Sequence, residues 1–433
     1  MAVSCFKKAD TQNDVLTQTA AAEDKIPVTV LVKYAFTINN FEKEIEKKFP
    51  NLDLIQVGNY TSDMGKDEYA ARLEHDDLTD VVMTWPLEVG EEYWDDRLID
   101  LSSLPLSGKY NTNMLDTISK DGKLYYLPGP SQIRGILYNK TLFKEMGWDV
   151  PKDFEGFLAL CDQIEKSGIR SLQLGLKNEE VFDTAFTGFG YANSFSKPED
   201  AQWIDNYNNG KGSFGDHFIP ALNTYKTLID RGILKKEDLN IDYSDREKMF
   251  FTRKCAMIED SVLMARMGNN TTGTNDEFGL MPFLNPAPDS DWARLYPVCY
   301  IGLNKNLESS KNKEKYDLIM ELLEYISTPE GQTLLASDTG GMLSSLNGTK
   351  PPNVPEIDAL FSTLTHGRYA VFTELQNAQS ALREGLAGML QGKLTTADVI
   401  KMVDQENSSP PQKPLPAVFG HASDDFTLME TGN

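Results

Sequence analysis

The sequence has little of what a metal site or a membrane span requires. Its 433 residues contain four cysteines and four isolated histidines, with no CxxC pair. Such separation excludes a zinc site and predicts that Cys161, Cys255 and Cys299, which lie in apolar patterns, are buried free thiols. No run approaches the ~18 apolar residues of a membrane span. We therefore expect no metal and no cofactor.

Basic residues are also scarce. Lysine and arginine together number 42 against 65 aspartates and glutamates, which gives a formal net charge of -23 at pH 7. A surface of that sign repels nucleic acid and anionic lipid, so neither is expected as a partner. The same charge is also explained simply by solubility, so composition alone indicates no function.

Common catalytic motifs are missing. The sequence contains no GxSxG, HExxH, P-loop or EF-hand pattern. Gly210, Gly212 and Gly215 spell GxGxxG, but they follow a polar aromatic stretch instead of a buried strand, which favours a turn over a phosphate cradle. The adjacent acidic pairs at 76–77 and 95–96 are predicted to point apart on solvated faces, whereas a glycosidase needs two carboxylates facing each other across a cleft.

Strand and helix patterns alternate in the first part of the chain. Strands are predicted at 28–33, 52–57 and 80–84, with helices at 38–49, where Thr37 is a candidate N-cap, and at 68–75. This alternation predicts a parallel, doubly wound sheet, in which ligands bind outside the carboxyl ends of the strands. The residues that follow those ends are Tyr34, Phe36, Asn59, Tyr60 and Trp85.

The segment 121–140 predicts a passage between two lobes. A short strand at 124–127 is followed by Pro128, Gly129 and Pro130, which prevent regular pairing, and a second strand runs directly into a helix start. A chain of this length is too long for one compact core, so two lobes are expected.

This segment and the stretch after it resemble the family 1 extracellular solute-binding proteins of carbohydrate ABC transporters. The resemblance implies an α/β, periplasmic-binding-protein-like fold: two doubly wound lobes joined by a multi-strand hinge, with a ligand cleft between them. The matching residues are Asp121, Gly122, Lys123, Tyr125, Leu127, Pro128, Tyr138, Asn139, Lys140, Leu142, Phe143, Gly147, Pro151 and Phe154.

The resemblance also implies a division of the chain. The expected first lobe is 27–132 with 277–327, to which the strand at 278–283 would return, and the second is 133–276 with 328–405, whose last part carries a long helix at 370–390. A tether at 1–26 precedes them and a linker with a tail at 406–433 follows. One departure from the family pattern is Arg253, which stands where the family has glycine.

A sugar site needs flat aromatic side chains for the apolar ring faces and planar polar groups for the hydroxyls. At positions that the implied fold puts in the cleft, the candidate ligand residues are Tyr34, Tyr60, Trp85, Gln132, Arg134, Phe182, Asp183, Asp260, Trp292 and Tyr296. For Arg134 there is a second interpretation, in which it pairs with a carboxylate of the protein and only stiffens the hinge.

The function implied is that of a monomeric binding protein, not an enzyme. It would capture an oligosaccharide by hinge closure and deliver it to an ABC transporter permease. The alternatives are a glycan-acting enzyme, or the same fold with a peptide, a polyamine, a metal ion or another solute as its ligand. Cys5, preceded by small residues and followed by a polar segment, is similar to a bacterial lipidation site, which predicts anchoring at the extracellular face of the cytoplasmic membrane and no other membrane contact. The last dozen residues resemble the start of a 5'-nucleotidase carboxyl-terminal domain, which predicts a longer natural chain.

Overall fold

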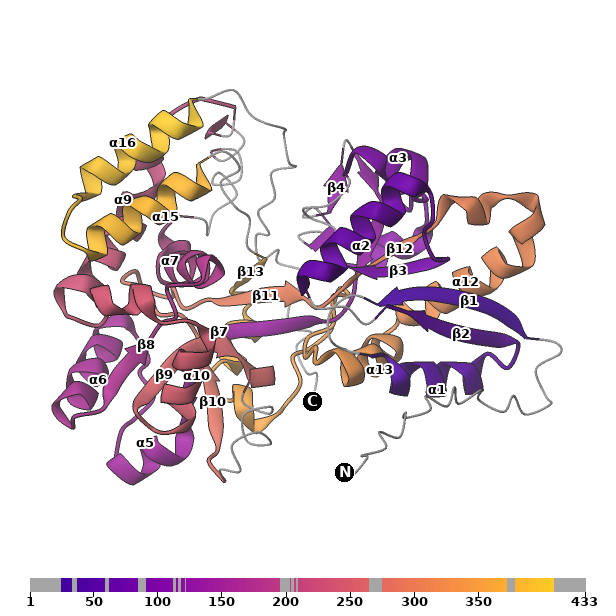
Figure 1. Ribbon diagram of the computed structural model, residues 1–433. Coiled ribbons are helices and arrows are strands. Elements are labelled where there is room, and N and C mark those ends of the chain that lie inside the picture. Colours follow the sequence, from indigo (N-terminus) through magenta and orange to yellow (C-terminus); the bar gives the residue numbers. More distant parts are fainter. Residues whose placement is uncertain are drawn as a thin grey trace, which may run out of the picture.

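Two mixed sheets, each covered by helices, form two lobes in the computed structural model of the protein (Figure 1). In the described part of the chain, no helix is both long enough and apolar enough to cross a membrane. The structure describes residues 25–32, 37–58, 62–84, 91–111, 114–115, 118–120, 122–194, 203, 206–207, 209–264, 275–371 and 378–408.

The first sheet has five strands in the order β2-β1-β3-β12-β6. The neighbours of β1 run parallel to it, as predicted, whereas β12 is antiparallel to both β3 and β6. Its strands are β1 (Ile26–Val32), β2 (Leu52–Val57), β3 (Val81–Thr84), β6 (Tyr126–Pro128) and β12 (Tyr300–Leu303). The helices of this lobe are α1 (Asn39–Lys48), α2 (Ser62–His75), α3 (Trp94–Arg97), α12 (Lys313–Ile326) and α13 (Pro329–Thr339).

The apolar stripe of α1 explains how this lobe packs. Phe41 and Ile45 recur at helical spacing and both are fully buried in the first core. The predicted cap was wrong: Ile38, not Thr37, occupies the N-cap position of α1, and it makes no side-chain hydrogen bond there. Instead, the backbone N–H of Phe41 donates to Asp338 on α13 at 2.6 Å, so a distant helix satisfies that end of α1.

The second sheet is centred on β7, a strand of nine residues. Its order is β13-β11-β7-β9-β8, and β10 also pairs with β7. The strands are β7 (Ser131–Asn139), β8 (Arg170–Gln173), β9 (Cys255–Ser261), β10 (Phe278–Met281), β11 (Ala293–Pro297) and β13 (Tyr369–Val371). The helices of this lobe are α5 (Lys140–Met146), α6 (Phe154–Lys166), α7 (Glu179–Ser194), α9 (Phe214–Asp230), α10 (Tyr243–Phe251), α14 (Phe361–Thr365), α15 (Gln379–Leu390) and α16 (Thr396–Asn407).

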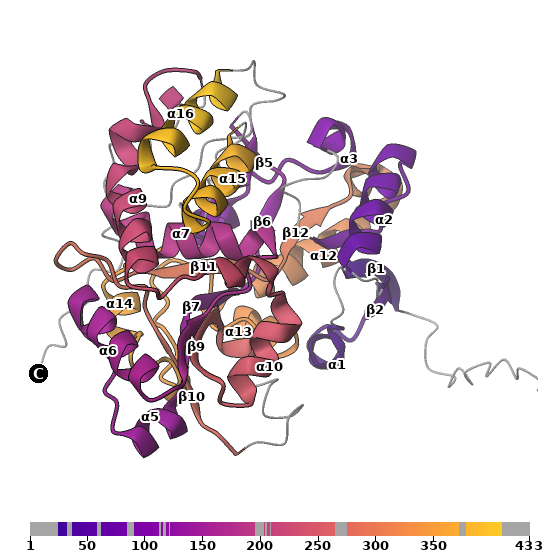
Figure 2. The same ribbon diagram turned by 60° about the vertical axis from the view of Figure 1, so that its left-hand side comes forward.

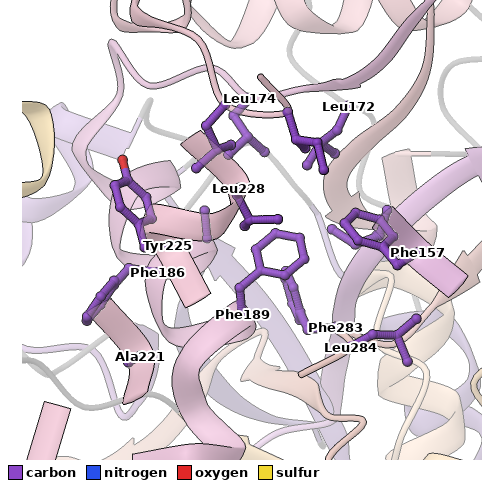
Figure 3. Packing of buried hydrophobic residues seen from close by; sticks show 14 of the residues in the cluster. Phe157, Leu172, Leu174, Phe186, Phe189, Ala221, Tyr225, Leu228, Phe283 and Leu284 are labelled. Carbon is purple, nitrogen blue, oxygen red and sulfur yellow. The ribbon is translucent and has the colours of Figure 1, made fainter. Parts of the chain in front are cut away.

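An aromatic core fastens α7 and α9 to one face of the second sheet. The ring of Phe189 lies 5.3 Å from that of Phe283 and 5.6 Å from that of Phe157, centroid to centroid. Figure 3 shows Phe189 among Leu228, Phe157 and Phe283. Each such buried side chain contributes about 1.5–3 kcal/mol. Figure 2 shows α9, α15 and α16 grouped together on the same side of β11.

Short elements complete the described chain. A separate ladder pairs β4 (Ser119–Lys120) with β5 (Lys123–Leu124). The 3-10 turns are η1 (Glu91–Tyr93), η2 (Pro105–Lys109), η3 (Lys236–Asn240), η4 (Lys305–Glu308), η5 (Ser310–Asn312) and η6 (Pro355–Ile357).

Three local expectations from the sequence differ from this arrangement. Strand β10 does not return to the first sheet: it pairs with β7, and β11 does the same. Helix α13, placed with the second lobe, buries Leu335 in the first core. The predicted helix at 370–390 begins only at Gln379, because 369–371 forms a strand beside β11. These differences arise because an apolar pattern in the sequence predicts a strand or a helix but does not show which sheet or core that element packs against.

Candidate functional site

Segments that pass between the two sheets lie side by side at the centre of the molecule. Gly129 and Pro130 join β6 to β7, and Val298 and Cys299 join β11 to β12. The N–H of Gly129 donates to the carbonyl of Cys299 at 2.8 Å, and that of Val298 donates to Pro130 at 2.9 Å. These paired connections are the predicted hinge.

A third segment runs beside this pair. After α13 the chain reaches Leu343, whose carbonyl accepts from the N–H of Ser131 at 2.7 Å. The hydroxyl of Ser345 donates to the carbonyl of Gly129. Leu343 belongs to the cluster that includes Leu295 of the second lobe, whereas Leu346 belongs to the first core, so this segment also links the lobes.

The carboxyl edge of the first sheet faces the hinge. Thr84, the last residue of β3, is paired with Tyr300, which directly follows the connection at Cys299. Parallel strands share this edge, so β1 also ends there. The predicted ligand residues Tyr34, Tyr60 and Trp85 come just after these strand ends and lie outside the described residues.

Polar side chains replace apolar ones on one face of β7 as the strand approaches the hinge. Ile136 and Tyr138 belong to the aromatic core that holds α7. Because side chains alternate along a strand, Gln132 and Arg134 share that face, whereas Ile133 points to the opposite one. The sequence-predicted pair Gln132 and Arg134 therefore lies between the second core and the hinge.

Arg134 is part of a buried group of charges. It donates to the carboxylate of Glu259 on β9 through Nε at 2.8 Å and through Nη2 at 3.2 Å. The guanidinium of Arg246 on α10, which is fully buried, donates to the backbone carbonyl of Glu259 at 2.7 Å and to the carboxylate of Asp260. We call these four residues the charge cluster. Asp260, a predicted ligand residue, is thus held by Arg246.

The charge cluster has a neighbouring acidic and aromatic environment. The Arg246 guanidinium lies 4.8 Å from the ring centre of Tyr243. Burial, and then the nearby negative charge of Asp260, raise the pKa of Glu247.

Asp183, another predicted ligand residue, is bound by α15. Its carboxylate accepts from Nε of Arg383 at 3.0 Å and from Nε2 of Gln379 at 2.6 Å. The next residue, Thr184, accepts a hydrogen bond from Arg294 on β11. Asp183 therefore joins α7 to α15.

The predicted aromatic residues are placed differently. Phe182 and Trp292 are each 6 % exposed and belong to the second core, and the backbone of Trp292 also pairs with that of Phe283. Tyr296 lies opposite Gln132 in the β7–β11 ladder, and its side chain is outside the described part of the structure. Ligand contact at these positions stays a prediction.

The sequence analysis missed Arg246, Glu259, Arg294 and Arg383. Strand alternation could have found Arg294, since β11 reads polar at 294 between the apolar residues 293 and 295. Arg246 and Arg383 lie on helices, where an arginine is ordinarily a solvated residue, so no local pattern distinguishes them.

The GxGxxG sequence is the turn that was predicted. Ser213 caps α9 in a capping box with Asp216. The carboxylate of Asp404 on α16 also accepts from the N–H of Phe214 at 2.7 Å, so a side chain of the protein occupies the place of an anion at this helix end.

Arg253 lies away from the candidate site. It precedes the start of β9, which pairs with the start of β8, whereas Ser261 at the other end of β9 pairs with Arg134. Its backbone has φ of 59°, the left-handed conformation that suits glycine. The departure from the family pattern therefore concerns the outer end of the second lobe.

Burial is the main influence on the pKa of the three buried thiols. Burial raises the pKa of Cys299 to about 12, and burial is also the first cause that raises the pKa of Cys161 and of Cys255 to about 12. All three are free and buried, as predicted, so they act as small apolar side chains.

Comparison with known proteins identifies the family. Residues 30–333 match the model of the bacterial extracellular solute-binding proteins. The chain belongs to this family. The resemblance seen at 121–140 is thereby confirmed, and the family is one of binding proteins, not of enzymes.

Two curated relatives match part of the chain. An uncharacterised ABC transporter extracellular-binding protein of Pyrococcus horikoshii is 28 % identical over 126 residues, 29 % of this chain and 30 % of the relative. A multiple sugar-binding protein of Streptococcus mutans is 23 % identical over 131 residues, 30 % of each chain. The chain thus spans about a third of the length of each of these relatives.

Solved structures of the same fold match over nearly the whole chain. A family 1 extracellular solute-binding protein of Bifidobacterium longum subsp. infantis has a TM-score of 0.68 at 16 % identity, covering 89 % of this chain and 100 % of that one. Apo RafE of Streptococcus pneumoniae has a TM-score of 0.66 at 16 % identity, covering 90 % and 98 %. The predicted two-lobed α/β fold of this solute-binding protein is confirmed.

Proposed function

We propose that this solute-binding protein captures an oligosaccharide between its lobes by closing about the hinge, and delivers it to an ABC transporter permease. The observation that carries the proposal is the change from apolar to polar side chains on one face of β7, next to the hinge. A ligand at that position touches the second lobe and the carboxyl edge of the first. Contact with both lobes favours the closed state, because only closure makes both sets of contacts.

The chemistry of this face suits hydroxyl groups. Gln132 offers a planar amide and Arg134 a planar guanidinium, and such groups pair with neighbouring sugar hydroxyls. The aromatic partners are Tyr34, Tyr60 and Trp85, which follow the ends of strands in the first sheet, and Tyr296, which is paired with Gln132 in the β7–β11 ladder.

Similar proteins support a carbohydrate as the ligand. One solved structure is RafE in complex with raffinose, with a TM-score of 0.62 at 17 % identity, covering 89 % of this chain and 98 % of that one. Another is a chitin oligosaccharide binding protein, with a TM-score of 0.64 at 18 % identity over 89 % and 100 %. At such low sequence identity these structures show a shared fold only. That the ligand of this protein is a sugar is therefore part of the proposal.

The cellular setting is part of the same proposal. The protein acts outside the cell as a monomer, is tethered to the cytoplasmic membrane through a lipid on Cys5, and hands its ligand to the permease. Cys5 and the tail from 409 lie outside the described residues.

A thermal-shift screen over oligosaccharides, followed by calorimetry, tests the proposal. A bound sugar should raise the melting temperature, and X-ray scattering should show a smaller radius of gyration. Gln132→Ala and Arg134→Ala should each weaken binding about tenfold, a loss of ~1.4 kcal/mol. The exposed Lys144→Ala on α5 is the matched control. A hit among amines or peptides, with none among saccharides, would overturn the ligand class.

A further inference from the structure

The first lobe has a buried hydroxyl without a partner at the edge that faces the hinge. Thr84 ends β3 and is 1 % exposed. Within the described part of the chain, its Oγ1 is covered by other atoms and makes no hydrogen bond. A hydroxyl that is removed from water and given no partner lowers the stability of the folded protein. The presence of such a group at this edge therefore needs an explanation.

Valine would suit this position better if stability were the only requirement. The rest of β3 is apolar, and valine has nearly the shape of threonine without the hydroxyl. Thr79, just before the strand, shows the usual arrangement of a buried threonine: its hydroxyl donates to the carbonyl of Val81 at 2.7 Å and accepts from the N–H of Leu31 at 3.2 Å. Thr84 has neither kind of bond.

The strand register places the side chain of Thr84 on the face of the first sheet that α2 covers. Val82, two residues before Thr84, is paired with Gly302, which is paired in turn with Tyr126. Directly opposed residues share a face, and residues two apart along a strand share it as well. Tyr126 shows which face this is, because its hydroxyl forms a hydrogen bond with that of Tyr69 on α2.

This face opens to the same side of the molecule as the candidate site of the second lobe. Gln132 and Arg134 share a face of β7 with Ile136, which belongs to the core that holds α7. Figures 1 and 2 show α2 and α3 on the same side of the central connections as α7, whereas α1 lies on the other side. Thr84 and Gln132 therefore border the hinge from different lobes but on one side of it.

We propose that Thr84 is the first-lobe hydrogen-bond partner of the captured sugar, and that its hydroxyl bonds one ring hydroxyl of the ligand. This inference rests on the proposed function. A hydroxyl both donates and accepts, so it matches a sugar hydroxyl in either direction. Because Oγ1 is covered in this structure, the ligand reaches it only after neighbouring side chains move. A ligand that bonds Thr84 and Gln132 together engages both lobes, which favours the closed state.

Thr84→Val and Thr79→Val test the inference in opposite directions. Thr84→Val removes a hydroxyl that has no partner, so the melting temperature of the unliganded protein should rise by about 2–4 °C. Its affinity for the best saccharide of the thermal-shift screen should fall about tenfold. Thr79→Val is the matched control: it leaves the N–H of Leu31 unpaired, so its melting temperature should fall and its affinity should stay unchanged. Thr84→Ser, which keeps the hydroxyl, should retain most of the affinity.

Monodeoxy analogues of the same saccharide identify the hydroxyl that Thr84 binds. One analogue should bind the native protein at least tenfold more weakly than the parent sugar, because it leaves a buried hydroxyl of the protein unpaired. The same analogue should lose nothing further in Thr84→Val, which has no hydroxyl to leave unpaired. Isothermal titration calorimetry measures the four combinations of protein and sugar.

Each outcome decides the inference. Unchanged affinity in Thr84→Val would overturn it, and so would an equal loss of affinity in Thr84→Ser. A lower melting temperature or a failure to fold in Thr84→Val would also overturn it, because either result would show that the hydroxyl already supports the folded protein. All of these outcomes leave sugar capture intact. Failure of the native protein to bind any saccharide would overturn the proposed function, and this inference with it.

Discussion

Gly129 and Cys299 are in contact at the point where two connections between the lobes cross. A Cβ atom at position 129 would lie 2.6 Å from Sγ of Cys299 and 3.1 Å from its carbonyl oxygen. Such a distance is far below van der Waals contact, so glycine is required here by space. Gly129 has a negative φ, so its backbone conformation does not itself require glycine.

We expect Gly129→Ala to destabilise the protein by about 1–3 kcal/mol through overpacking. The measurement is urea denaturation followed by circular dichroism. Adding Cys299→Ala should recover part of the loss, because it removes Sγ but leaves the carbonyl. Gly108→Ala is the control, since a Cβ there meets nothing within 4 Å. Equal stability of Gly129→Ala and Gly108→Ala would contradict the close approach.

The strained backbone of Arg253 is compensated by ion pairs. Its Nε donates to Asp276 at 2.9 Å and its Nη1 to Glu145 at 2.8 Å. The hydrogen bond from Arg253 is the main cause that lowers the pKa of Asp276, aided by one from Asn139. Holding an arginine in the left-handed conformation costs of order 1–2 kcal/mol of stability. Arg253→Gly therefore removes this strain, but it also removes the two ion pairs.

Acid stability separates the two effects. Because the pKa of Asp276 is lower in the folded state than in the unfolded chain, its contribution is present above the unfolded value. It is lost as pH falls through the folded value, from about pH 5 downward. We therefore expect the stability of the native protein to fall more steeply between pH 5 and 3 than that of Arg253→Gly, by denaturation at each pH. Parallel curves for the two proteins would sink this account.

The sequence predicted elements better than it predicted their partners. The run Ile133–Tyr138, which follows Pro128 and Pro130, correctly indicated the strand that leaves the hinge. Strand β10 was also predicted, but its two faces are both apolar, with Leu280 on one and Met281 on the other, and such a strand fits either sheet. The pairing of Leu280 with Leu137 places β10 in the second sheet, and the sequence pattern does not reveal that pairing.

Residues of the candidate site could be predicted only where their position along the chain, next to the hinge, determines their place in the structure. Gln132 and Arg134 follow the hinge in sequence, so their place between the lobes could be inferred. The partners of Arg134 could not, because Glu259 comes 125 residues later and reaches it through the register of β9. Arg294 is opposite Arg134 for the same reason, through β11.

Asp404 anchors the last described helix to the second lobe. Besides Phe214, it accepts from the hydroxyls of Ser213 at 2.6 Å and Tyr207 at 3.1 Å. Burial, and then the charge of Asp404, raise the pKa of Tyr207, which keeps that hydroxyl a donor. We expect Asp404→Ala to cost about 1–3 kcal/mol, because the donors it leaves behind are partly buried.

Proteolysis and denaturation measure that loss. Asp404→Ala should also speed cleavage near α16, since the helix loses its tie to α9. The neighbouring Gln405→Ala, at an exposed position of the same helix, should change stability by no more than about 0.5 kcal/mol. A loss in Gln405→Ala as large as that in Asp404→Ala would assign the effect to helix propensity instead.

The charge cluster predicts a difference between its two arginines. Arg246→Met removes a fully buried cation that bonds both Glu259 and Asp260, whereas Arg134→Met leaves Glu259 beside Arg246. Breaking a buried pair on one side costs about 3–5 kcal/mol, so Arg246→Met should be strongly destabilised or fail to fold, and Arg134→Met should lose clearly less. Adding Asp260→Asn to Arg246→Met should recover stability, because it removes the buried charge left without its partner. Urea denaturation of the three variants measures this, and a larger loss in Arg134→Met than in Arg246→Met would show that Glu259 depends on Arg134 instead.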